Sequence, residues 1–206
     1  MISSTKPIYL ASRSLRRREL LRQIGVGFEL LLLREEPRRG FDVDENPHQG
    51  EAPLDYAMRV AGAKAAAGLQ AVSRRTGVIK PVLAADTTIA LDGRIIGKPR
   101  DTEDAVLILA ALSGRSHSVI TAVAMAYGDR FETRVSESMV SMHALDDARI
   151  RRYVASGEPM DKAGAYAVQG RAAAFIRRIE GSYSGIMGLP LAETTALLAL
   201  FGIEIL

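Results

Sequence analysis

One stretch constrains the fold more than any other: VLAADTTIALDGRIIGKP, residues 82–99. Two apolar runs flank Asp92 and Gly93, and an Asp-Gly pair is a preferred two-residue turn between antiparallel strands. The pattern predicts a β-hairpin whose first strand is largely buried. Asp86 interrupts that strand directly after VLAA, and a buried carboxylate requires a cation, a metal ion or a functional reason. Pairing about the turn also brings Lys98 near Asp86.

The rest of the chain alternates between apolar strands and helices. Strands are expected at residues 8–11, 27–33 and 172–181, with two more around the turn at Gly128 and Asp129. Caps and apolar spacing predict helices at residues 15–24, 53–72, 101–112, 146–156 and 191–201. No internal repeat interrupts this order. The alternation predicts an α/β fold, a mixed twisted sheet flanked by helices, in a single domain that spans residues 1–206.

The helix expected at 53–72 has small residues on one face, at Ala57, Ala61 and Ala65. A row of small side chains lets a helix pack closely on its neighbour. Gly25, directly after the helix expected at 15–24, is expected to be a left-handed cap residue.

Composition excludes several classes of protein. The net charge is +3, because 27 basic and 24 acidic residues nearly cancel, and tryptophan is absent. That balance argues against a nucleic-acid-binding protein. The absence of cysteine excludes disulfides, thiolate metal sites and a cysteine nucleophile. No stretch approaches the roughly 18 apolar residues of a membrane span, and the first residues lack a signal-peptide pattern. A cytoplasmic protein is therefore expected.

Three consecutive arginines lie in LASRSLRRRELL, residues 10–21. Arg16 and Arg17 stand four positions before Leu20 and Leu21, so they extend the apolar stripe of the helix. Two guanidinium groups aimed inward are costly unless an anion binds there, and the free N–H groups of the first turn, with Ser12 and Ser14, would help to hold a phosphate. Ion pairs with acidic residues of the fold are an equal alternative.

Other polar residues are individually weak signals. Lys162 and Gln169 lie in DKAGAYAVQG, residues 161–170, a glycine-bounded segment that is neither clearly helix nor strand. Lys64 is on the helix expected at 53–72. His117 is expected to be a hydrogen-bonded turn residue, and the three histidines are too scattered for a metal cage. Neither GxxxxGK[ST] nor GxGxxG occurs, so a phosphate site would not be of the common glycine-rich kinds.

Five segments in register carry a family resemblance: LASRSLRRRELL, AADTTIALDGRIIGKPRD, LSGRSHSVITAVAM, VASGEPMDKAGAYAVQG and IEGSYSGIMGLPLAET. In this order and at these separations they resemble the Maf family of nucleoside triphosphate pyrophosphatases, from about Tyr9 to Phe201. The resemblance implies hydrolysis between the α and β phosphates, with release of the monophosphate and pyrophosphate, and a Mg²⁺ or Mn²⁺ ion. It also implies two lobes around a central cleft and a possible homodimer.

The resemblance also assigns roles to residues. Asp86 matches the general base for the attacking water, and Glu45 and Asp86 match the acids that hold the metal. The positions that match the substrate site are Ser12, Arg16, Arg17, Lys64, Thr87, Lys98, Lys162 and Gln169. A triphosphate with about four negative charges requires several fixed cations and a metal, so the roles agree with the chemistry.

Base preference is implied at three positions. Relatives that act on dTTP and UTP have Arg, Thr and Gln where this chain has Arg16, Thr87 and Gln169, whereas those that act on 7-methylguanosine triphosphate tend to have Trp, Gln and Glu. An amide that both donates and accepts suits the neutral edge of uracil or thymine. The resemblance therefore implies dTTP and UTP, with modified uridine nucleotides as further substrates and removal of unwanted nucleotides as the role.

The sequence departs from the family pattern at two places, and two alternative functions stay open. Leu15 replaces the usual proline of the Ser-Pro-Arg-Arg loop, which removes a fixed backbone angle. The loop over residues 34–43 is longer than usual, so Glu35, Glu36 or Glu51 could hold the metal instead of Glu45. A 7-methylguanosine triphosphate pyrophosphatase of the same family is one alternative. The other is a nucleotide-binding regulator of septum formation with incidental hydrolysis, although such a module gains nothing from a buried carboxylate beside a polyanion.

Overall fold

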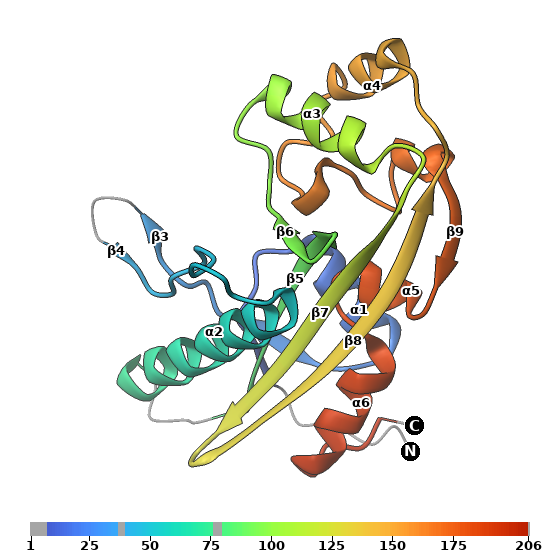
Figure 1. Ribbon diagram of the computed structural model, residues 1–206. Helices are drawn as coiled ribbons and strands as arrows, with labels where there is room; N and C mark the ends of the chain where they lie inside the picture. Colours follow the sequence, from blue (N-terminus) through green and yellow to red (C-terminus); the bar gives the residue numbers. More distant parts are fainter. Residues whose placement is uncertain (1–7, 37–39, 76–79, 206) are drawn as a thin grey trace.

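A twisted sheet of seven strands forms the centre of the computed structural model, which describes residues 8–36, 40–75 and 80–205 (Figure 1). The strand order is β2-β1-β5-β7-β8-β9, and β6 pairs with β5. β1 is parallel to β2 and β5, and the other pairs are antiparallel. The strands are β1 (Ile8–Leu10), β2 (Phe28–Leu30), β5 (Val82–Leu91), β6 (Arg94–Ile96), β7 (Ser116–Tyr127), β8 (Arg130–Met142) and β9 (Ile176–Glu180). The short strands β3 (Glu35–Glu36) and β4 (Gly40–Phe41) form a separate pair.

Helices cover both faces of the sheet (Figure 1). They are α1 (Leu15–Gln23), α2 (Pro53–Arg75), α3 (Thr102–Leu112), α4 (Asp147–Val154), α5 (Tyr183–Ile186) and α6 (Leu191–Leu200), with 3₁₀ turns at Ala163–Ala165 and Arg171–Phe175. The mixed sheet with flanking helices confirms the predicted fold class. No helix in the part of the chain that the structure describes is long and apolar enough to cross a membrane.

Successive side chains along a strand point to opposite faces of the sheet, so the core consists of two clusters, one on each face. On one face, α2 packs against β5 and β7, and its Ala57, Ala61 and Ala65 are fully buried, as the row of small residues predicts. On the other face, Leu20 and Leu21 of α1 join residues of α3, α4 and α6. The clusters fix which side chains of a strand meet which helix.

Backbone geometry confirms the predicted turns. Asp92 and Gly93 both have positive φ, at 52° and 73°, and join β5 to β6 as a hairpin. Gly25 ends α1 with φ 73°. These positions favour residues that tolerate the left-handed region, which is why they are readable from sequence.

Some elements differ from the expectations. The strand expected at 172–181 begins as a 3₁₀ turn over Arg171–Phe175, and only Ile176–Glu180 pairs with β8. The strand expected at 27–33 is limited to Phe28–Leu30, the stretch that pairs with β1. His117 is a strand residue of β7 rather than a turn residue, although it is hydrogen-bonded as expected. The short helix α5 had no sequence prediction; Ser182 caps it by accepting a hydrogen bond from the Gly185 N–H.

One edge of β5 is left open in its middle. β7 pairs with β5 along Val82–Ala90, whereas the opposite edge pairs with β1 only at Val82 and Leu83 and with β6 only from Ile89 onwards. Among the described residues, positions 84–88 therefore have a strand partner on one side only. Side chains from both faces of the sheet can reach this gap.

Candidate active site

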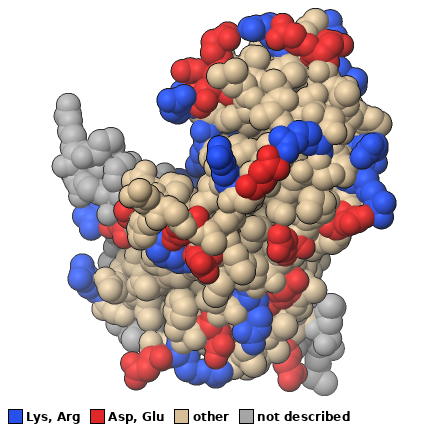
Figure 2. Space-filling view, in the orientation of Figure 1, with Lys and Arg blue, Asp and Glu red and all other residues tan. Residues whose placement is uncertain are grey.

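A cavity of about 1140 Å³ opens at the uncovered stretch of β5. In Figure 2 the outline of the molecule is indented between the lobe that carries α3 and α4 and the lobe that carries α2, with Lys and Arg side chains at the upper edge. The cavity brings together all ten residues of the predicted site: Ser12, Arg16, Arg17, Glu45, Lys64, Asp86, Thr87, Lys98, Lys162 and Gln169.

Asp86 and Thr87 approach the cavity from opposite faces of β5, because consecutive strand residues point to opposite sides. Asp86 lies on the face that α2 covers and is 7% exposed. Its carboxylate Oδ1 accepts a hydrogen bond from Lys64 Nζ at 2.8 Å. The buried carboxylate thus has the cation that its environment requires.

Lys64 bridges two carboxylates. Its Nζ lies 2.8 Å from Asp86 Oδ1 and 3.0 Å from Glu45 Oε1. Lys64 is mostly buried, while the side chain of Glu45 is 42% exposed toward the cavity. Two carboxylates from separate elements therefore converge on one cationic position.

Oxygen ligands at this position suit a divalent cation. Mg²⁺ is usually held by one or two carboxylates, with water and substrate phosphates completing its shell. The described residues contain no cluster of three or more His, Cys, Asp or Glu side chains, so Asp86 and Glu45 would supply part of a coordination shell. The donor set fits a hard, hydrated cation that is shared with a phosphate.

The other acids of the preceding loop have different partners. Glu51 accepts hydrogen bonds from Arg59 Nε at 2.6 Å and from Arg59 Nη2 at 2.9 Å. The bonds with Arg59 lower the pKa of Glu51 to about 2. Asp44 accepts from the backbone and side chain of Asn46. The side chains of Glu35 and Glu36, which the sequence left as alternatives, lie outside the described residues.

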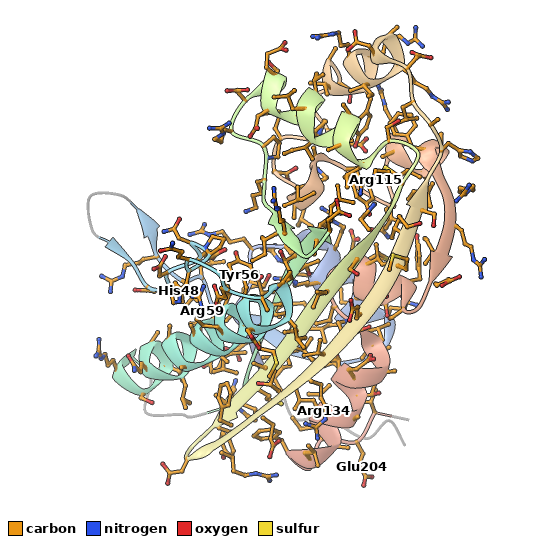
Figure 3. The ribbon with its side chains drawn as sticks, viewed as in Figure 1. His48, Tyr56, Arg59, Arg115, Arg134 and Glu204 are labelled. Carbon is orange, nitrogen blue, oxygen red and sulfur yellow. The ribbon has the colours of Figure 1, made fainter. Side chains whose placement is uncertain are left out.

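Arg59 and Tyr56 hold the loop that carries Glu45. Arg59 also donates to the backbone carbonyls of Asp44 and Asn46, and the Tyr56 hydroxyl donates to the Glu45 carbonyl at 2.9 Å. In Figure 3 Tyr56 and Arg59 lie together with His48 at the beginning of α2. Burial raises the pKa of Tyr56, and the charges of Asp86 and Glu45 raise it further, so the hydroxyl stays a donor.

The first turn of α1 positions Arg17. Ser14 caps the helix by accepting from the Arg17 N–H, and this cap forms although Leu15 stands in place of proline. The guanidinium donates to Gly188 O at 2.7 Å, Ser12 Oγ at 3.3 Å and Thr87 Oγ1 at 3.2 Å. All three acceptors are neutral. Within the described residues Arg17 therefore makes no direct ion pair, which was the alternative that the sequence left open.

The charge of Arg17 is nevertheless influenced by its surroundings. Burial lowers the pKa of Arg17, and the nearby carboxylates of Asp86 and Glu45 oppose that effect. Arg16 lies beside it, half-buried, and also lines the cavity. The site therefore concentrates positive charge where an anion can enter.

The segment that contains Lys162 and Gln169 is tied at its two ends by Glu158. The carbonyl of Glu158 accepts from Lys162 Nζ at 2.7 Å, and its carboxylate accepts from the Arg171 N–H at 3.1 Å. Lys162 also pairs with the carboxylate of Asp161. Gln169 is exposed in the cavity, where its amide can reach a ligand.

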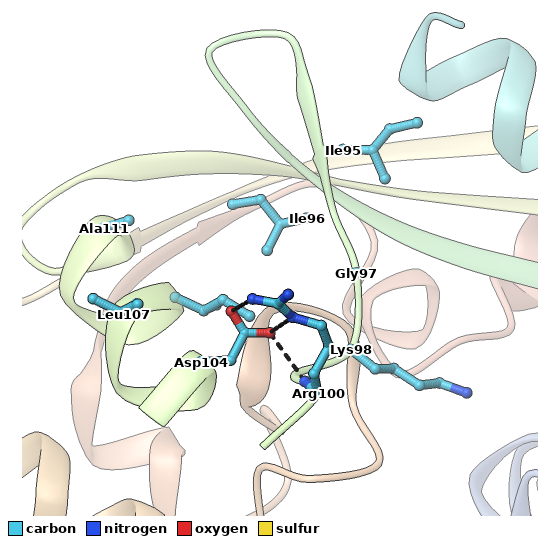
Figure 4. A pocket seen from close by; sticks show the side chains of 9 residues that line it. Ile95, Ile96, Gly97, Lys98, Arg100, Asp104, Leu107 and Ala111 are labelled. Carbon is cyan, nitrogen blue, oxygen red and sulfur yellow. Dashed lines mark hydrogen bonds and ion pairs between the residues drawn. The ribbon is translucent and has the colours of Figure 1, made fainter. Parts of the chain in front are cut away.

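Lys98 lies between two hollows. It lines the large cavity and also a neighbouring hollow of about 400 Å³ beside α3, where Arg100 and Asp104 form an ion pair. Figure 4 shows the Lys98 side chain extended away from that pair. Lys98 and Asp86 thus line one cavity, as the hairpin predicts.

Some residues of the site were not found from sequence. Tyr56, Glu158 and Gly188 line the cavity, and Thr121 lies directly behind Thr87. No local pattern marks Thr121, because its position depends on the register between β5 and β7, which are joined through β6 and α3. For Glu158, which lies in the segment GEPMDK, its own charge is the only signal that the sequence offers.

Comparisons with known proteins agree along nearly the whole chain. A family model described as "Maf-like protein" matches residues 7–201. The dTTP/UTP pyrophosphatase of Aromatoleum aromaticum is 59% identical over 196 residues, which are 95% of this chain and 95% of that protein. The dTTP/UTP pyrophosphatase of Nitrosomonas europaea is 52% identical over 96% of both chains.

Among solved structures, the Staphylococcus aureus Ham1 protein matches with a TM-score of 0.46 and 19% identity. The match covers 95% of this chain and 97% of that one.

Proposed function

This chain belongs to the Maf family, and we propose that it hydrolyses dTTP and UTP to the corresponding monophosphate and pyrophosphate. The observation that carries the proposal is the convergence of Asp86, Glu45 and several cations on one cavity at the open edge of β5. Removal of unwanted nucleotides, modified uridine nucleotides included, is the role that such an activity would serve.

Asp86 is the proposed general base. The oxygen of a water molecule would bond to the α-phosphorus, its proton would pass to the Asp86 carboxylate, and the bond from the α-phosphorus to the bridging oxygen would break. A positioned base contributes typically ~10²–10⁴-fold to such a reaction. Pyrophosphate then leaves with the bridging oxygen.

Asp86 and Glu45 are also the proposed holders of a Mg²⁺ or Mn²⁺ ion. A divalent ion at this place would neutralise charge on the phosphates and favour loss of a proton from water. Lys64, which lies between the two carboxylates, supplies a further positive charge next to the same oxygens.

The cations are proposed to bind the triphosphate. Arg17 is placed by neutral acceptors and keeps its charge for an anion, and Ser12 supports it. Arg16, Lys64, Lys98 and Lys162 line the same cavity. Fixed donors of this kind stabilise charge that develops during phosphoryl transfer.

Selection of the base is proposed to depend on Arg16, Thr87 and Gln169. The amide of Gln169 can accept from and donate to the edge of uracil or thymine.

A homodimer is a further proposal from the family, and light scattering of the purified protein tests it.

The proposed activity is tested by measuring pyrophosphate and orthophosphate separately. The purified protein is incubated with Mg²⁺ or Mn²⁺ and with dTTP, UTP, CTP, GTP, 7-methyl-GTP or ATP. We expect pyrophosphate from dTTP and UTP above all, and none after the metal is removed with EDTA. A main product from 7-methyl-GTP would contradict the base assignment, and binding without release from any nucleotide would favour the regulatory alternative.

A further inference from the structure

Thr121 is a polar residue in the apolar middle of β7. Its neighbours along the strand are Ile120 and Ala122, and its own side chain is 0% exposed. In the antiparallel ladder it stands directly opposite Thr87 of β5. A buried hydroxyl at such a place is costly unless it is hydrogen-bonded, so its partners define what it does.

Thr121 and Thr87 link Arg17 to the backbone of α5. Arg17 Nη2 lies 3.2 Å from Thr87 Oγ1, the two threonine oxygens are 2.9 Å apart, and Thr121 Oγ1 lies 2.8 Å from Gly185 O. A guanidinium can only donate and a carbonyl can only accept, and each hydroxyl has one proton. All three contacts are satisfied together when Thr121 donates to Gly185 and Thr87 donates to Thr121.

The direction of these hydrogen bonds leaves Thr87 as an acceptor for Arg17. Because the Thr87 proton is directed at Thr121, the lone pairs of Thr87 Oγ1 are available to accept from Arg17. With Gly188 O and Ser12 Oγ, three of the five N–H groups of the guanidinium then have acceptors within the described residues. The other two are available for a bound anion in the cavity.

The close packing around Gly188 supports the same arrangement. Gly188 has φ 109°, a conformation that favours glycine, and a Cβ added there would lie 3.4 Å from both Arg17 Nε and Thr87 Oγ1. The segment from Gly185 to Gly188 therefore accepts a hydrogen bond from Thr121 at one end and from Arg17 at the other.

We propose that Thr121 is a positioning residue for the reaction: it orients the Thr87 hydroxyl and, through Thr87, fixes the guanidinium of Arg17 on the substrate phosphates. The inference rests on the proposed function, in which Arg17 binds the triphosphate. Since phosphates are common to all the nucleotides, loss of Thr121 weakens turnover of dTTP and UTP by the same factor.

The test begins with Thr121→Val, which keeps the shape of the side chain and removes its hydroxyl. We expect kcat/KM for both nucleotides to fall about tenfold, because Thr87 loses the acceptor that orients its hydroxyl, while Gly185 O keeps the Gly188 N–H as a donor. Thr121→Ser restores the hydroxyl and is expected to recover most of the loss. The matched control is Thr194→Val, because Thr194 is also fully buried but donates to the carbonyl of Pro190, the residue directly before α6. This control leaves kcat/KM unchanged.

A double-mutant cycle with Arg17→Lys separates positioning from general damage. Thr121→Val is expected to cause no further loss of kcat/KM when Arg17 is already replaced. An equal loss in both backgrounds, no loss in the wild-type background, or no recovery with Thr121→Ser would overturn the proposal. If Thr121→Val does not fold, Thr87→Val breaks the same chain from the cavity side, and the same cycle is measured with it. If base preference changes in Thr87→Val but not in Thr121→Val, that change reports the proposed role of Thr87 in base selection, which is independent of Arg17.

Binding distinguishes this inference from the proposed activity. A dTTP analogue with a methylene group between the α and β phosphorus atoms is titrated calorimetrically into each variant. We expect Kd to rise about tenfold for Thr121→Val and not to rise further in the Arg17→Lys background. Wild-type protein that binds the analogue but releases no pyrophosphate from any nucleotide contradicts the proposed function alone. An unchanged Kd for Thr121→Val contradicts the role of Thr121 alone.

Discussion

At His117 the side chain is 2% exposed, and its Nε2 lies 2.8 Å from the Tyr166 hydroxyl. Burial lowers the pKa of His117 from 6.5 to about 4. In the unfolded chain the imidazole takes up a proton as the pH falls through 6.5, whereas in the folded protein it stays neutral until about pH 4. The unfolded state therefore binds more protons in this window, and stability decreases as the pH decreases.

We expect the free energy of unfolding to decrease between about pH 6.5 and pH 4, with His117 contributing about 3 kcal/mol of that decrease. His117→Gln removes the titrating group and keeps a partner for Tyr166, so its stability changes less over this range. Urea unfolding at several pH values measures the difference. His143→Gln is the control, because His143 is exposed. The same slope in His117→Gln and in the wild type would contradict the assignment.

At the scale of elements, α2 is the helix whose packing controls Lys64. Ala57, Ala61 and Ala65 are fully buried against β5 and β7, which brings the helix close enough for Lys64 to reach Asp86. Larger side chains on this face would move the helix away from the sheet. The position of the site therefore depends on the size of residues that do not contact a ligand.

Ala61→Leu inserts a large side chain into this contact and is expected to reduce the free energy of unfolding by about 1–3 kcal/mol. Ala66→Leu, on the exposed side of the same helix, is expected to change it by less than about 0.5 kcal/mol. Urea denaturation of the two variants beside the wild type gives both values. Equal effects at the two positions would exclude close packing of α2 as the cause.

Local signals account for the elements that sequence predicts well. The Asp92-Gly93 hairpin, the left-handed residue Gly25 after α1 and the small-residue face of α2 each depend on neighbours within a few positions. The sequence predicts a strand over residues 172–181, but its first part forms a 3₁₀ turn, in which Ala172 and Phe175 are buried without pairing with β8. Thr121 could not be found at all, since only the register of β7 against β5 gives it a role.

At the scale of the whole molecule, the site results from a gap in the sheet. β1 and β6 cover the two ends of one edge of β5 and leave its middle open, and the cavity lies at this opening. Sequence predicts which polar residues interrupt the apolar pattern, such as Asp86. Long-range pairing decides that residues as distant as Arg16 and Gln169 line the same cavity.

For the proposed reaction, the cavity supplies cations that a net charge of only +3 does not reveal. Its lining gathers cations from α1, α2 and the segments after β6 and α4, while other charges form exposed ion pairs such as that of Arg115 with Asp92. A local positive potential in a concave site is sufficient for steering, whatever the net charge.

The proposed role of Asp86, as the base in a pyrophosphate-releasing reaction, is tested most directly with Asp86→Asn. We expect pyrophosphate release from dTTP to fall at least ~10²-fold, while calorimetric binding of the methylene analogue persists, because Lys64 and Arg17 remain in place. Asp129→Asn, in the exposed turn between β7 and β8, is the matched control and keeps the wild-type rate. Release by Asp86→Asn at close to the wild-type rate would contradict the account.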